Sequence, residues 1–442
     1  MYRHRRILPL LLALGPQVLA ADLPTEWIDP DTGHRVIRLS REDGTQSLYF
    51  NQNAYTADGK KLIVTTAGGG IATINLATRE VRPLVAGPVS VLVAGHKTGD
   101  VYYTKRAAGG RGSAASVVYA TNVDTGVTRE VVHLPPGRAV ASLNADETLL
   151  LGTYVDGAAA PAPAANRLPG VDPRFGQPDY AAVGADGKPM TYADAKDLRL
   201  HNTLMATRAG APRVLFTVNA KTGETKDIFR EHEWLGHLQF SPTDPDVIMF
   251  CHEGTWHEVD RIWTIHADGA GLKKIHTRTM NMEIAGHEFF SSDGATIWYD
   301  LQTPRGQDFW LAGYKVATGK RTWYHLERNE WSVHFNVSPD GTLFAGDGGD
   351  SEMVARAPDG KWIYLFRPQR VPDVAGIKTA NSEDLIDTGF FQSERLVNMS
   401  KHDYRLEPNV TFSPDMKWVV FRSNMLGPVH VYAVEIARSA SR

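Results

Sequence analysis

A chain of 442 residues with 42% hydrophobic residues and a formal net charge of −3 at pH 7 has enough apolar material for a substantial core. Acidic and basic residues are interspersed, so the sequence offers no basic surface of the kind that binds nucleic acid. Beyond the N-terminal segment, no stretch is apolar and long enough to span a bilayer. The single cysteine, Cys251, cannot form an internal disulfide, and we expect it to be buried.

The first twenty residues have the pattern of a secretory signal peptide. Basic residues at 3–6 precede the apolar run 7–14, and Val18–Ala20 ends in small residues that suit a cleavage site. We therefore expect residues 1–20 to be removed. The mature chain, residues 21–442, is then expected to be periplasmic or secreted.

A short motif recurs along the rest of the chain. A small or hydroxyl-bearing residue leads into an Asp-Gly type turn, and a strand-like run of β-branched and aromatic residues follows. One such hairpin per 40–50 residues, roughly, is typical of a β-propeller. The copies begin at Ala57, Lys97, Ala145, Ser241, Ser292, Ser338 and Ser413.

A second turn, of the Thr-Gly type, alternates with the first at 121–132, 218–229 and 314–324. The last copy stops after His430–Ile436, and the missing half stands near the other end of the chain, at 28–39. We predict an all-β fold, a seven-bladed β-propeller closed by the N-terminal strand, which hides two sheet edges. A tandem array of unclosed β-modules is the alternative.

Two insertions interrupt this rhythm, at about 156–204 and 367–403. The first begins rich in Ala and Pro and then carries a candidate helix at 191–205, and the second carries a polar helix candidate around Ser382–Asp387. Long loops on a rigid scaffold often carry binding groups, so we expect both insertions to lie over one face of the ring, at its mouth. Flexible spacers are the alternative.

The candidate functional residues stand just before inner strands. His237, His287, His334 and the pair Glu407 and Asn409 all have this position. Inner strands of a propeller begin at one rim, so we expect these side chains to converge on the central mouth. Such a set suits a metal site with open coordination or an acid/base site. Structural histidines that link neighbouring blades are the alternative.

The region from about Asn53 to Ala437 resembles the oligogalacturonate lyase family, bacterial seven-bladed enzymes that act on pectin fragments. The most specific stretch is Glu-Trp-Leu-Gly-His at 233–237, followed by Phe-Cys-His-Glu-Gly at 250–254. Further ordered matches are Tyr55–Leu62, Val218–Glu224, His257–Asp260, Trp263, His287–Phe289, His334 and Asp340–Gly348. The resemblance implies cleavage of short oligogalacturonides by metal-assisted β-elimination to 4,5-unsaturated products, with a divalent metal, typically Mn²⁺.

β-Elimination sets chemical requirements for the site. The C5 proton of a uronate is weakly acidic while the adjacent carboxylate keeps its charge, so a cation must neutralise that group. A neutral imidazole is a suitable base near neutral pH. The resemblance assigns the base to His237, the uronate-contacting arginine to Arg213 and a metal ligand to His287. We expect further substrate contacts from His252, His257, His334 and Arg405.

The chain departs from the family pattern in the last blade. Where the family carries Gln-x-x-His-x-His, this chain has Tyr404, Glu407 and Asn409 in place of the Gln and the two His. We therefore expect the metal ligands to be His287, Glu407 and Asn409. Carboxylate and amide oxygens favour harder ions, which keeps Ca²⁺ and Mg²⁺ open beside Mn²⁺. Alternatively no metal binds, and Arg405 or Arg213 neutralises the substrate.

Two other functions stay open at this point. The altered last blade suits a lyase that acts on another uronate-containing oligosaccharide. The Ser-Pro-Asp-Gly turns also occur in TolB-like propellers, which would make the chain a non-catalytic binder of saccharide or protein. A serine hydrolase is disfavoured, because the chain contains no Gly-x-Ser-x-Gly elbow.

Overall fold

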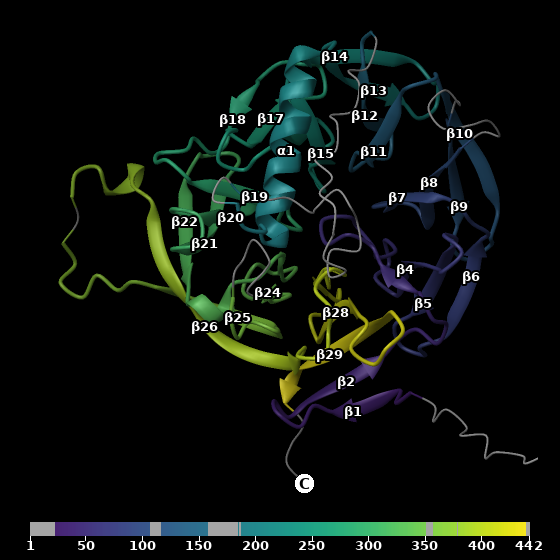
Figure 1. Ribbon diagram of the computed structural model, residues 1–442. Helices are drawn as coiled ribbons and strands as arrows, with labels where there is room; N and C mark the ends of the chain where they lie inside the picture. Colours follow the sequence, from purple (N-terminus) through teal and green to yellow (C-terminus); the bar gives the residue numbers. More distant parts are fainter. Residues whose placement is uncertain are drawn as a thin grey trace, which may run out of the picture.

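The structure is a computed structural model that describes residues 23–106, 116–157, 184, 187–350, 357–377 and 379–438. The predicted signal peptide and the Ala/Pro-rich part of the first insertion lie outside the described residues. The described part is almost entirely β, and its sheets stand around a common centre as a ring (Figure 1). Within it, no helix is long and apolar enough to cross a membrane. Cys251 is buried, as expected.

Most sheets are four-stranded antiparallel meanders in which consecutive strands pair. The first two are β3 (Gln46–Ser47), β4 (Lys61–Thr65), β5 (Ile71–Asn75), β6 (Val81–Val85), and β7 (Ser90–Ala94), β8 (Asp100–Arg106), β9 (Ser116–Asn122), β10 (Thr128–Leu134). The next two are β11 (Ala139–Leu143), β12 (Leu149–Val155), β13 (Arg213–Asn219), β14 (Thr225–Glu231), and β15 (Trp234–Phe240), β16 (Val247–Glu253), β17 (Ile262–His266), β18 (Lys273–Lys274).

The following sheet has eight strands, made of two meanders joined by parallel pairing of β22 with β26. Its strands are β19 (Ile284–Phe290), β20 (Thr296–Gln302), β21 (Phe309–Lys315), β22 (Arg321–Leu326), β23 (Phe335–Val337), β24 (Phe344–Gly346), β25 (Trp362–Arg370) and β26 (Asp387–Asn398).

The last sheet joins the two ends of the described chain. It contains β27 (Thr411–Phe412), β28 (Trp418–Ser423), β29 (His430–Arg438), β2 (His34–Arg38) and β1 (Glu26–Ile28). Val36 of β2 pairs with Val434 of β29, and both are fully buried. The predicted closure by the N-terminal strand is therefore confirmed, and β1 adds one strand at the outer edge.

The recurring Ser-Pro-Asp-Gly turns fold as the sequence predicts. In the copy at Ser338, the serine hydroxyl donates to Asp340 Oδ1 over 2.6 Å, and the backbone N–H of Thr342 donates to the same oxygen over 3.1 Å. Gly341 has φ +73°, a conformation that glycine adopts readily. The same hydroxyl-to-carboxylate bond occurs at Ser291 and Ser413, so each of these inner strands ends in a rigid hairpin.

Helix α1 (Tyr192–Ala209) ends the first insertion and crosses in front of β15 and β19 at the centre of the ring (Figure 1). Thr191 caps it by accepting a hydrogen bond from the backbone N–H of Asp194 over 3.2 Å. The helix runs to residue 209, beyond the predicted end at 205, because the chain turns only at Gly210, directly ahead of β13.

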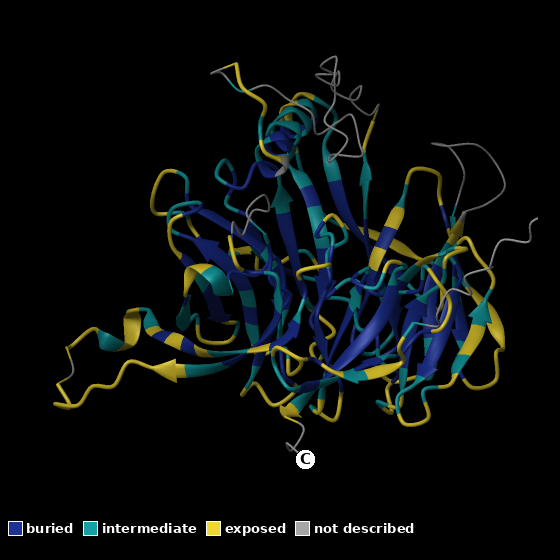
Figure 2. Ribbon diagram, turned by 60° about the horizontal axis from the view of Figure 1, so that its bottom comes forward, coloured by how far each residue is buried: buried dark blue, intermediate teal, exposed yellow. Residues whose placement is uncertain are grey.

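The second insertion does not lie over the mouth, so our expectation for it was wrong. The described residues between β25 and β26, 371–377 and 379–386, project outward from the ring (Figures 1 and 2). The extended hairpin of β25 and β26 itself pairs with the outermost strand β22. The predicted helix around Ser382–Asp387 is only a three-residue 3-10 turn, Ser382–Asp384. Pairing with β22 and β25 on both sides holds the following residues in strand β26 instead.

Candidate active site

Three residues on the innermost layer share an uncommon backbone conformation. His237, His287 and Asn409 have φ values of 47°, 46° and 55°, and each stands four residues before a turn serine. A non-glycine residue in this left-handed region is uncommon and is often found at functional sites. The register of β15 and of β19 shifts at the histidine, so a β-bulge turns each imidazole toward the centre of the ring.

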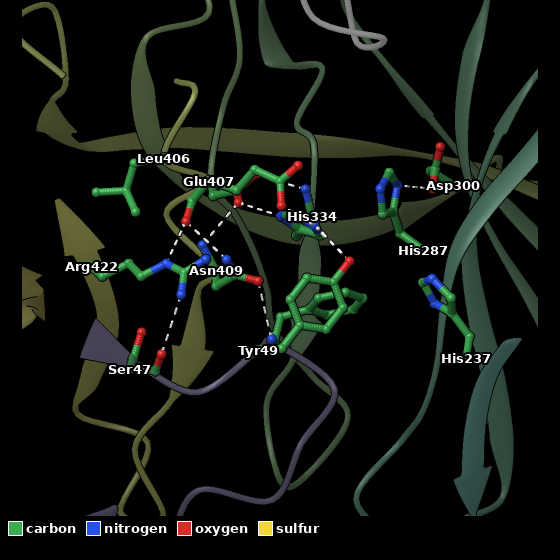
Figure 3. A network of polar contacts seen from close by, with 12 residues as sticks. Ser47, Tyr49, His237, His287, Asp300, His334, Leu406, Glu407, Asn409 and Arg422 are labelled. Carbon is green, nitrogen blue, oxygen red and sulfur yellow. Dashed lines mark hydrogen bonds and ion pairs between the residues drawn. The ribbon is translucent and has the colours of Figure 1, made fainter. Parts of the chain in front are cut away.

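His287 and His334 lie side by side, with ring centroids 4.7 Å apart. Each Nδ1 contacts a buried carboxylate over 2.8 Å, which is Asp300 for His287 (Figure 3) and Asp347 for His334. This arrangement fixes the ring and leaves Nε2 as the outward nitrogen, as in histidines that ligate metals. Burial opposes the charging of His287, but Asp300 outweighs it and raises the pKa of His287.

Glu407 brings a carboxylate to the same place. Its Oε2 lies 3.7 Å from His334 Nε2, which also lies 3.2 Å from the hydroxyl of Tyr49 (Figure 3). The backbone carbonyl of Glu407 accepts hydrogen bonds from Arg422 Nε and from the side chain of Asn409, each over 2.8 Å. Burial would raise the pKa of Glu407, but the electrostatic interactions with His334, Lys196, His287 and Arg422 outweigh it and lower that pKa.

Asn409 is fully buried, and internal contacts occupy its amide. Its Oδ1 accepts a hydrogen bond from the backbone N–H of Phe50 over 3.2 Å, and its own backbone N–H donates to Asp347 over 3.1 Å. Asn409 therefore positions Glu407 and Asp347. Its predicted role as a metal ligand draws no support from these contacts.

His237 lies between two carboxylates that share one arginine. Its Nε2 is 3.4 Å from Glu253 and its Nδ1 is 3.5 Å from Glu288, while Arg261 donates to both carboxylates over 2.9 Å. About a quarter of the His237 side chain stays exposed, in a cavity of about 400 Å³ that Tyr49 also lines. Burial, helped by Arg261, outweighs the two carboxylates and lowers the pKa of His237. The imidazole is therefore held neutral, as a base requires.

Arg213 and His252 lie further out, at the rim of the neighbouring sheets. Arg213 opens β13, and its Nε is buried without a hydrogen-bond partner among the described residues, so burial lowers its pKa. His252 contacts Glu231 over 2.5 Å and stacks on Trp263 at 5.0 Å. No contact joins Arg213 to His237 within the described part of the chain.

His257 and Arg405 occupy two different surroundings. His257 lies 3.8 Å from Asp197 of α1 and lines a cavity of about 600 Å³ between the helix and the loop after β16. Arg405 is exposed on its loop and donates from Nε to Asp403 over 2.9 Å. The structure thus brings His237, His287, His334 and Glu407 together and leaves Arg405 outside this group.

Sequence reasoning missed several residues of the site, among them Asp300 and Arg422. Arg261 directly follows the matched stretch 257–260, and Glu288 directly follows His287, so their places in the sequence were a usable signal. The sequence carries no comparable signal for Tyr49 or Lys196, because only the folded ring brings these residues to the mouth.

A divalent cation fits this set of side chains. Among the described residues no three His, Cys, Asp or Glu side chains are already arranged around one point as a metal site. The chemistry is nevertheless suitable, because two carboxylate-backed imidazoles and the carboxylate of Glu407 are donors that Mn²⁺ accepts. The surroundings hold an excess of two negative charges, from five carboxylates against three cations: Glu253, Glu288, Asp300, Asp347 and Glu407 against Arg261, Arg422 and Lys196.

The ring of sheets, with histidines and carboxylates gathered at its mouth, places the chain among propeller-like folds. The chain belongs to the oligogalacturonate lyase family, whose sequence model matches residues 183–440. The oligogalacturonide lyase of Pectobacterium atrosepticum is 28% identical over 235 residues, which are 51% of this chain and about half, 56%, of that protein. The oligogalacturonate lyase of Dickeya dadantii is 23% identical over 426 residues, 93% of this chain and 95% of that protein.

Two solved structures share the fold. An oligogalacturonate lyase in complex with manganese aligns with a TM-score of 0.67 and 21% identity, over 93% of this chain and 96% of that one. An oligogalacturonate lyase from Vibrio parahaemolyticus aligns with a TM-score of 0.67 and 20% identity, over 94% of this chain and 97% of that one.

Proposed function

We propose that the protein is an oligogalacturonate lyase that cleaves short pectin-derived oligogalacturonides by metal-assisted β-elimination and releases 4,5-unsaturated products. The observation that carries this proposal is the facing arrangement of a neutral imidazole, His237, and a potential cation site made by His287, His334 and Glu407. Elimination at a uronate needs both a base and a neutralised carboxylate.

His237 acts as the base. A neutral imidazole has one N–H for one of its two carboxylate neighbours and leaves its other nitrogen to accept the C5 proton. The imidazolium that forms is stabilised by Glu253 and Glu288, while Arg261 keeps the resting imidazole from charging too early. The electron pair of the C5–H bond forms the C4–C5 double bond, and the C4–O bond breaks with its electron pair on the oxygen, which takes up a proton from water.

His287, His334 and Glu407 would hold the metal, for which Mn²⁺ is the proposal and Ca²⁺ or Mg²⁺ the alternatives. When bound, a divalent cation neutralises the uronate carboxylate and makes the C5 proton more acidic. Asp300 and Asp347 orient the two imidazoles, and Asn409 and Arg422 hold the backbone of Glu407. Arg213, whose Nε has no internal partner among the described residues, contacts the substrate from the rim.

The proposal extends to the architecture and the location of the protein. Division of the eight-stranded sheet at the β22–β26 pairing gives seven blades, because each half is a four-stranded meander like the others. The signal-peptide pattern of residues 1–20 supports export to the periplasm or beyond.

One observation favours a second candidate, a lyase for another uronate-containing oligosaccharide. The loop before β27 carries Glu407 and Asn409 where the resembling family has two histidines. A carboxylate at the mouth changes the charge that the substrate meets, and this difference bears on which uronide fits best.

The test is incubation of the purified mature protein with trigalacturonate, with and without EDTA and added Mn²⁺ or Ca²⁺. We expect metal-dependent growth of the ultraviolet absorbance of the conjugated product. Replacement of His237 by Ala should lower kcat about a thousandfold, since a positioned base contributes roughly 10²–10⁴-fold.

His266→Ala is the matched control, because His266 is an exposed histidine of the same sheet that pairs with Asp246. It should retain wild-type activity. Full activity of His237→Ala would refute the assigned base. No absorbance change with trigalacturonate, together with activity on other oligouronides, would favour the second candidate.

A further inference from the structure

Helix α1 is fixed to the ring as a rigid element at the mouth. Arg305, which precedes β21, binds Asp194 of the helix over 3.1 Å and also binds Asp197. His201 contacts Glu258 over 2.8 Å, further along the helix. The apolar contacts lie beneath the helix, where Leu200 packs with Trp256 and Ile284.

Lys196 projects from this helix at the level of the active site. Its ammonium nitrogen lies 5.6 Å from the centre of the Trp256 ring, and Trp256 is itself only 6% exposed. Lys196 lies near enough to Glu407, in the loop before β27, and to Glu253, at the end of β16, for its charge to help lower the pKa of each.

No carboxylate among the described residues lies within ion-pairing distance of Lys196. A lysine held over an aromatic ring at a half-buried position, without an anionic partner of its own, is suited to bind an anion from solution. An oligouronide offers one carboxylate per sugar, and the site formed by His287, His334 and Glu407 accounts for only one of them.

We propose that Lys196 binds the carboxylate of the sugar next to the one that loses its C5 proton. Helix α1 then selects acidic oligosaccharides over esterified ones. This inference rests on the proposed function, because it takes the oligouronide as the ligand of the same mouth. It makes Lys196 a substrate-binding and specificity-determining residue.

The test measures the binding of trigalacturonate and of its methyl ester by calorimetry, in a His237→Ala background that prevents turnover. Lys196→Gln should weaken trigalacturonate binding by about tenfold or more, because a hydrogen bond to a charged group contributes roughly 1.5–3 kcal/mol. Lys196→Arg should retain part of the affinity. Binding of the methyl ester should change less than twofold, which a merely structural role of Lys196 would not produce.

Lys274→Gln is the matched control. Lys274 also lies over a tryptophan, 5.2 Å from the Trp263 ring, but it pairs with Asp260 outside the mouth. Affinity of Lys196→Gln within twofold of this control, or an equal loss for the methyl ester, would overturn the proposal.

The outcomes separate this inference from the proposed function. If the protein binds trigalacturonate through Lys196 but releases no unsaturated product, the role of Lys196 in binding stands and the proposed lyase activity is refuted. A protein that binds no trigalacturonate would refute the role of Lys196 whatever its activity on other substrates.

Discussion

The site depends on single residues held in a strained backbone. A left-handed conformation costs a residue with a side chain about 1 kcal/mol or more, and His237, His287 and Asn409 all adopt it. The bulge that carries this strain aims the two histidines at the mouth, where a regular strand would alternate its side chains between two faces. Carboxylates behind the rings then fix which nitrogen faces the substrate.

The carboxylate behind His287 gives a test at this scale. Asp300→Asn keeps an oxygen that can accept the Nδ1–H but removes the negative charge. We expect Mn²⁺ affinity to fall by about tenfold to a hundredfold, the usual effect of a lost partner behind a metal-binding histidine. Calorimetric titration of the purified variant with Mn²⁺ measures it.

Asp246→Asn is the control, because Asp246 forms the same kind of contact with His266, over 2.7 Å, but at an exposed position. Its Mn²⁺ affinity should equal that of the wild type. Equal affinity in Asp300→Asn as well would show that His287 is not a ligand.

Much of this site could be predicted from the sequence, for a physical reason. The turn that opens with a serine, Ser241 or Ser291, fixes where the inner strand ends. Residues four positions before that serine therefore occupy equivalent places on the ring, and His237 and His287 follow from this spacing. Asn409 has the same place, yet its amide oxygen accepts a hydrogen bond from Phe50 of the neighbouring sheet. The sequence did not predict this, because a contact between residues far apart in the chain leaves no local signal. The place of Lys196 at the mouth could not be predicted for the same reason.

At the scale of elements, the two insertions show where local sequence determines secondary structure and where it does not. The helix at 192–209 was predictable, because Thr191 caps it and good helix formers follow. The segment around Ser382–Asp387 has a similarly polar composition, but it forms only the short 3-10 turn Ser382–Asp384, and from Asp387 onward the chain pairs with β22 and then also with β25. Long-range pairing of β26 therefore overrides a weak local helix preference, and the second insertion projects outward from the ring.

The docking of α1 gives a test at this scale. Arg305→Met leaves the largely buried Asp197 without its cation, and the loss of one partner of a buried pair costs about 3–5 kcal/mol. Asp194 is more exposed, so we expect the lower end of this range in the free energy of unfolding. Urea unfolding followed by tryptophan fluorescence measures the loss.

The double variant Arg305→Met with Asp197→Asn should recover part of the stability, because the buried charge is then removed as well. Lys320→Met is the control, since its pair with Asp387 is exposed and should contribute less than about 1 kcal/mol. A loss in Arg305→Met no larger than in this control would mean that the ion pairs do not hold the helix.

At the scale of the whole molecule, the ring joins the ends of the chain in one sheet. β2 from the N-terminal side pairs with β29 from the C-terminal side, so that neither is left as an open edge inside the ring. A core continues through this junction, where Val36 packs with Val397 and Val434. The mouth exists only while the ring is closed, because its residues come from sheets on different sides of it.

Val36 therefore tests closure. Val36→Ala removes buried methyl groups at the junction and should lower the free energy of unfolding by about 2 kcal/mol. Val127→Ala is the control, because Val127 is 66% exposed and should change stability by less than about 0.5 kcal/mol. Guanidinium unfolding followed by both fluorescence and circular dichroism measures the two variants. If closure holds the ring together, both signals shift equally in Val36→Ala, since opening the junction releases every sheet. A shift in one signal alone would indicate sheets that unfold independently, as in an unclosed array.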